Sequence, residues 1–149
     1  MSDALYSSEI LRLAADIPHI GRLDRPDGSA RRVSRLCGSE VGVEIALERG
    51  AVSDIALQVK ACALGQASAS ILAKHAIGAT PAEIADARDA LAAMLKGADA
   101  PEGRFAELSV LEAARAYPAR HASIRLAFEA AADACAAALN TATETTLTG

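Results

Sequence analysis

The feature that most constrains the fold is a change of hydrophobic period within residues 43–59. Arg49 and Gly50 separate two runs in which apolar residues recur at every second position. The apolar members are Val43, Ile45 and Leu47 in the first run and Ile55, Leu57 and Val59 in the second. A period of two places one face of a strand in a core, and an intervening glycine suits a tight turn. We therefore expect an antiparallel hairpin with one buried face, joined by a third strand at Arg32–Leu36.

The segments on either side of this hairpin carry helical spacing. An apolar stripe over residues 5–17 ends before Pro18, and residues 18–31 hold the Gly, Pro, Asp and Ser of an irregular connection. Small residues dominate the segment from Cys62 to Gly78. The pattern predicts a helix on each side of the strands.

The C-terminal half is predicted to be helical throughout. Thr80-Pro81-Ala82-Glu83 is typical of a capping box with proline at the first helical position, and that helix should end near Lys96. Two more helices are expected at 105–117 and 119–139. The order predicts an α+β fold, a three-stranded antiparallel sheet packed against helices with an N-terminal helix and a long C-terminal helix. We expect one domain over residues 1–139 and a flexible tail at 140–149.

Composition narrows the class of protein. The net charge of −4 argues against nucleic acid as the main partner. No apolar run approaches the ~18 residues that span a bilayer, so no membrane partner is expected. The first residues carry acids early and meet Pro18, unlike a signal peptide. Three widely spaced cysteines suit a reducing compartment, and we expect a cytoplasmic protein with free thiols.

Cys37 and Cys62 lie at the two ends of the predicted sheet. Because alternate strands run in the same direction, the chain that leaves the third strand returns to the end where the first strand finishes. The two thiols could meet there as metal ligands drawn from different elements. The alternative is that both are small buried residues, since no C-x-x-C pair is present. Cys135 falls on the apolar stripe of the last helix and is expected in the core.

Three segments resemble the U-type (NifU N-terminal-like) iron–sulfur cluster assembly scaffold family. They read SRLCGS at 34–39, VKACALGQASASILAKHAIGATPAEI at 59–84 and GRFAELSVLEAARAYPARHASIRLAFEAA at 103–131. The resemblance runs from about Leu5 to Leu139. It implies three antiparallel strands packed against helices, in agreement with the pattern analysis.

The resemblance also implies a site. Members of the family hold a nascent [2Fe–2S] cluster, or a zinc ion, on three cysteines and an acidic residue at one end of the sheet. Cys37 and Cys62 match the first two cysteines. Ser39 occupies the position of the aspartate and Ser123 that of the third cysteine, so this chain is a divergent member.

Neutral serine hydroxyls are poor replacements, because a [2Fe–2S] cluster takes four ligands and prefers thiolates. Glu40 follows Ser39, and His121 precedes Ser123 by two positions; both are candidate supplementary ligands. Arg120 matches a basic position of the family and would stabilise an anionic cluster. Cys135 is too distant from Ser123, about 18 Å along a helix that rises ~1.5 Å per residue.

The resemblance implies a carrier, not an enzyme, that binds iron, zinc or a transient cluster through Cys37 and Cys62. Its implied partners are a cysteine desulfurase and acceptor apoproteins. Two subunits of a homodimer would pool their cysteines, or a partner or small thiol would complete the site. The alternatives are an interaction module that kept the fold, lost the cluster and modulates the desulfurase, or a persulfide acceptor at Cys62.

Overall fold

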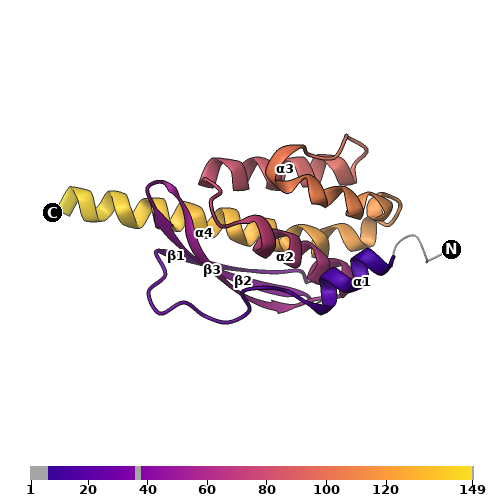
Figure 1. Ribbon diagram of the computed structural model, residues 1–149, viewed down its shortest axis with the longest axis horizontal. Helices are drawn as coiled ribbons and strands as arrows, with labels where there is room; N and C mark the ends of the chain where they lie inside the picture. The colour runs from indigo at the N-terminus through magenta and orange to yellow at the C-terminus, as the bar shows by residue number, and fades with distance from the viewer. Residues whose placement is uncertain (1–6, 36–37, 149) are drawn as a thin grey trace.

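A three-stranded antiparallel sheet forms one layer of the molecule, as predicted. The computed structural model describes residues 7–35 and 38–148, apart from the side chains beyond residue 140. The strands are β1 (Gly28–Val33), β2 (Glu40–Glu48) and β3 (Ala51–Lys60), in the order β1-β2-β3 (Figure 1). Arg49 and Gly50 both have positive φ in the β2–β3 turn, which matches the right-handed twist of a hairpin.

The first strand begins earlier than its predicted position at Arg32–Leu36. β1 pairs with β2 from Gly28 opposite Ile45 to Val33 opposite Glu40. Its sequence, GSARRV, lacks apolar alternation because most of its side chains are exposed. Backbone hydrogen bonds to β2 therefore fix this strand, and residues 28–31 belong to the sheet instead of to the irregular connection.

Helices cover one face of the sheet in two layers. The helices are α1 (Ser8–Ala15), α2 (Ala63–His75), α3 (Pro81–Leu95) and α4 (His121–Thr148), with the 3-10 helices η1 (Gly103–Ala116) and η2 (Pro118–Arg120). α4 packs on β1 and β2, and α2 packs on β3 and on α4. α3 contacts α4 and η1 and lies farther from the sheet (Figure 1).

The start of α3 matches its prediction from the sequence, whereas the end of α4 does not. The side chain of Thr80 accepts from the backbone of Glu83, whose carboxylate accepts in return from Thr80, so the predicted capping box at α3 is confirmed. α4 continues to Thr148, beyond the end predicted near Leu139, and projects past the sheet in Figure 1. The flexibility of residues 140–149 stays a prediction.

Alanine and glycine let α4 approach the sheet closely. A Cβ at Gly28 would lie 2.1 Å from the carbonyl oxygen of Ala134 and 2.5 Å from the nitrogen of Ala138. The side chains of α4 in this buried region are small and include Ala130, Ala131, Ala134 and Ala138. A chain with few aromatic residues thus closes its core by short distances between backbones.

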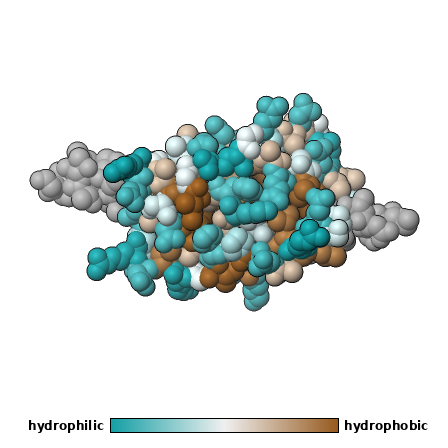
Figure 2. Space-filling view, in the orientation of Figure 1, coloured by the Kyte–Doolittle hydropathy of each residue, from teal (hydrophilic) through white to brown (hydrophobic). Residues whose placement is uncertain are grey.

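Exposed apolar side chains are spread along the chain. Among the described side chains, the large ones are Leu11, Ile20, Val33, Ile77, Tyr117 and Leu139, each from a different segment. Figure 2 shows polar side chains over much of one face, with smaller apolar areas between them. Within the described residues, no helix combines the length and apolar character needed to cross a membrane.

Candidate metal-binding site

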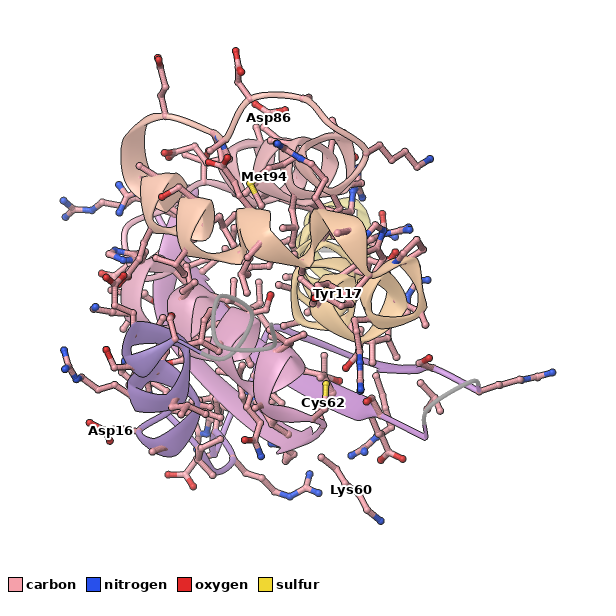
Figure 3. The ribbon with its side chains drawn as sticks, turned by 90° about the vertical axis from the view of Figure 1, so that its right-hand side faces the viewer. Asp16, Lys60, Cys62, Asp86, Met94 and Tyr117 are labelled. Atoms are coloured by element: carbon pink, nitrogen blue, oxygen red, sulfur yellow. The ribbon has the colours of Figure 1, made fainter. Side chains whose placement is uncertain are left out.

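The starts of three elements converge at one end of the sheet. Glu40 at the start of β2 pairs with Lys60 at the end of β3, so the chain entering β2 lies beside the chain leaving β3. Ser39 stands just before that pair, and Cys62 stands just after it as the N-cap of α2. Ser123 approaches from the first turn of α4. Figure 3 looks onto this end, where the Cys62 sulfur lies near the ends of the strands.

The three side chains form a continuous chain of polar contacts. The Oγ of Ser123 lies 3.4 Å from the Sγ of Cys62 and 3.0 Å from the Oγ of Ser39. Ser39 is 3% exposed and Ser123 is 1% exposed, whereas Cys62 is half-buried. The two hydroxyls therefore lie on the inner side of the site.

A glycine makes this approach possible. A Cβ at Gly65 would lie 2.6 Å from the Oγ of Ser123 and 3.1 Å from its carbonyl oxygen. Because real Cβ atoms do not come so close, only glycine lets the first turns of α2 and α4 pack together here. Gly65 was not among the predicted site residues; a glycine inside a helical segment was the available signal.

Of the residues predicted for the site, the structure brings Ser39, Cys62 and Ser123 together. These are the positions that the resemblance aligned with the aspartate, the second cysteine and the third cysteine. Cys37 lies outside the described residues. Cys135 is 2% exposed, and burial raises the pKa of its thiol to about 11, so its prediction as a core residue is confirmed.

Glu40 is not brought to the hydroxyl pair. Its carboxylate forms an ion pair with Arg31 across the two paired strands. Ser39 and Val41 are buried while Glu40 between them is half-exposed, as expected for neighbours that point to opposite faces of a strand. Glu40 therefore acts, in this conformation, as a cross-strand partner on the outer face of the sheet.

The two basic candidates lie on the approach to α4. Arg120 ends η2 and is exposed. The Nε2 of His121 lies 2.9 Å from the carbonyl oxygen of Ala114, so this nitrogen donates and only Nδ1 is left to bind a metal. Among the described side chains, no group of three His, Cys, Asp or Glu residues could hold a metal ion.

Comparison with known proteins gives one consistent result. The profile of the NifU-like N terminal domain matches residues 5–124. The crystal structure of a nitrogen-fixing NifU-like protein (N-terminal) from Brucella abortus is 47% identical, with a TM-score of 0.90 over 93% of this chain and 96% of that chain.

Two further proteins match at lower identity. The iron–sulfur cluster assembly scaffold protein IscU of Thermotoga maritima is 28% identical over 116 residues, which cover 78% of this chain and 82% of that protein. A putative iron–sulfur cluster assembly scaffold protein for the SUF system from Fervidobacterium islandicum AW-1 is 20% identical, with a TM-score of 0.83 over 91% of this chain and 99% of that chain. At 20% identity, this last comparison supports the fold alone.

Proposed function

Because the chain belongs to the NifU-like N-terminal domain family of iron–sulfur cluster assembly scaffolds, we propose that it carries iron, zinc or a transient [2Fe–2S] cluster on Cys37 and Cys62. The observation that carries the proposal is the convergence of Cys62 with Ser39 and Ser123 at one end of the sheet. Both serines stand where the family has ligands.

The donor set suits a cargo that is held briefly. Thiolates are strong ligands for iron and zinc, whereas neutral hydroxyls are weak ones. With Cys37 and Cys62, the chain supplies half of the four ligands that a [2Fe–2S] cluster takes. The other two come from a second subunit, from a small thiol, or from the protein that delivers or receives the cluster.

The proposed reaction sequence makes the chain a carrier and not an enzyme. A cysteine desulfurase is the source of sulfur, and acceptor apoproteins take the assembled cluster. We place this in the cytoplasm, because free thiols persist in reducing surroundings.

Anaerobic reconstitution with ferric iron, sulfide and a thiol reductant tests the proposal. The wild-type protein should gain visible charge-transfer absorption and acid-labile sulfide, and both should disappear in Cys37→Ala and in Cys62→Ala. Cys135→Ala is the matched control, because Cys135 lies in the core; it should load as the wild type does. Native mass, measured on the same samples, shows whether loading pairs two subunits.

A restored variant separates the proposal from its alternatives. Ser39→Asp combined with Ser123→Cys recreates the ligand types of the family and should hold the cluster longer than the wild type. An empty wild type beside a loaded double variant would mean that this chain is an interaction module that lost its cargo. Sulfur transfer to Cys62 that persists in Cys37→Ala, without iron uptake, would instead identify a persulfide acceptor.

A further inference from the structure

The hydroxyl of Ser123 is in position to donate a hydrogen bond to the Cys62 sulfur instead of binding a metal. Its Oγ lies 3.4 Å from Sγ, within hydrogen-bond reach of sulfur, and 3.0 Å from the Oγ of Ser39. Packing restricts this hydroxyl, because α2 passes so close that a Cβ at Gly65 would lie 2.6 Å from it. Ser123 therefore has little room to turn away from Cys62.

The direction of these hydrogen bonds follows from metal binding. A cysteine that ligates a metal has lost its proton, so its sulfur can only accept a hydrogen bond. A serine hydroxyl has one proton to donate. When Ser123 donates a hydrogen bond to the Cys62 sulfur, its only proton is used. The contact between the two serines is then a hydrogen bond that Ser39 donates to Ser123. The chain then runs from Ser39 through Ser123 to the sulfur.

We propose that Ser39 and Ser123 are positioning residues for the Cys62 sulfur and are not metal ligands. This inference rests on the proposed function, because it concerns the same sulfur and the same cargo. Hydrogen bonds to a ligating sulfur fix its direction and withdraw electron density from the metal–sulfur bond. The relay thereby weakens the bond between Cys62 and its cargo and favours release.

Burial strengthens the effect. Both hydroxyls are almost fully buried, where a hydrogen bond to a charged acceptor is stronger than in water and successive bonds polarise one another. Removal of either hydroxyl should therefore raise the electron density on the Cys62 sulfur. The Ser123 variant should show the larger change, since Ser39 acts through Ser123.

Cobalt(II) as a probe metal distinguishes a donor from a ligand. Its thiolate charge-transfer band reports the electron density on sulfur, and its d–d bands report the coordination number. Ser123→Ala should leave the bound cobalt and the d–d intensity unchanged and move the charge-transfer band to lower energy. Extraction of cobalt by a chelator should become about tenfold slower, the scale of one charge-assisted hydrogen bond.

Two further variants complete the experiment. Ser39→Ala should shift the same band in the same direction by less, and it tests the relay even where Ser123→Ala folds poorly. Ser70→Ala is the matched control, because Ser70 is also a buried serine but lies on α2, where its hydroxyl donates to the carbonyl oxygen of Asp16. It should leave the spectrum unchanged.

The outcomes separate this inference from the proposed function. Loss of cobalt or of d–d intensity in Ser123→Ala would make Ser123 a ligand and overturn the relay. An unchanged charge-transfer band in both serine variants would overturn it as well, while the function would stand if Cys62→Ala lost the spectrum. A wild type that binds no cobalt would overturn both.

Discussion

The sulfur of Cys62 and the hydroxyl oxygen of Ser123 lie 3.4 Å apart, although 61 positions separate the two residues in the chain. Cys62 caps α2 where the chain leaves β3, and Ser123 lies in the first turn of α4. The site is therefore built by two helix starts that meet at one end of the sheet. Its geometry depends on how closely these helices pack.

Substitution Gly65→Ala should separate the two helices. The new Cβ would lie 2.6 Å from the Oγ of Ser123 and 2.8 Å from the Cβ of Ala61. We expect a loss of about 1–3 kcal/mol in the free energy of unfolding, measured with urea, and weaker metal uptake.

Gly42→Ala is the control for this change. A Cβ there would meet the Oε1 of Gln58 at 2.7 Å, which is the end of a flexible side chain and can move aside. It should cost less than Gly65→Ala and leave metal uptake intact. Equal uptake in the two variants would contradict a role for helix approach in the site.

Local patterns in the sequence predicted much of the fold. The period of two over residues 43–59 and the Thr80–Glu83 capping box each depend on neighbours in the chain, and both match the structure. β1 was misplaced because its pairing with β2 leaves no apolar pattern in its own residues. The Thr-rich end of α4 has weak helix propensity, so the pattern ended that helix too early.

The site was only partly accessible to such reasoning. Strand direction predicts that the chain before β2 and the chain after β3 share one end of the sheet, which brings Ser39 near Cys62. The arrival of Ser123 depends on tertiary packing of α4, and only the resemblance pointed to it. The role of Gly65 becomes clear from the distance between two helices, which no spacing rule specifies.

Buried serines on α2 should respond in opposite ways to truncation. Ser68 is fully buried, and its hydroxyl has no hydrogen-bond partner in the described part of the chain. Ser68→Ala removes an unsatisfied polar group and should be neutral or stabilise the protein by up to about 1 kcal/mol. Ser70→Ala removes a bond to Asp16 and should destabilise it by about 1 kcal/mol. Urea unfolding measures both, and a larger cost at Ser68 would reveal a partner for its hydroxyl.

Alkylation should distinguish the two described cysteines. Burial raises the pKa of Cys135 to about 11, so at neutral pH its thiol is protonated as well as inaccessible. Cys62 is half-buried at the N-terminus of α2. Iodoacetamide, followed by peptide mass spectrometry, should modify Cys62 in the native protein and reach Cys135 only in urea. Modification of native Cys135 as fast as Cys62 would argue against its place in the core.

Acid should remove the contribution that Glu107 makes to stability. Burial raises the pKa of this carboxyl, but hydrogen bonds from His75, at 2.8 Å, and Lys74, at 3.1 Å, outweigh it and hold the pKa below its usual 4.5. A folded-state pKa below the unfolded value stabilises the protein above about pH 4.5, and this contribution is lost as the pH falls through the folded value. Glu107→Gln should therefore lower the free energy of unfolding at pH 7 by about 1 kcal/mol or less, since the pairs are partly exposed.

The difference in the free energy of unfolding between Glu107→Gln and the wild type should narrow in urea titrations below pH 4. Lys74→Gln should cost less in the Glu107→Gln background than in the wild type. If the difference in the free energy of unfolding persists at low pH, Glu107→Gln destabilises the protein by changing its packing and not by removing a charge.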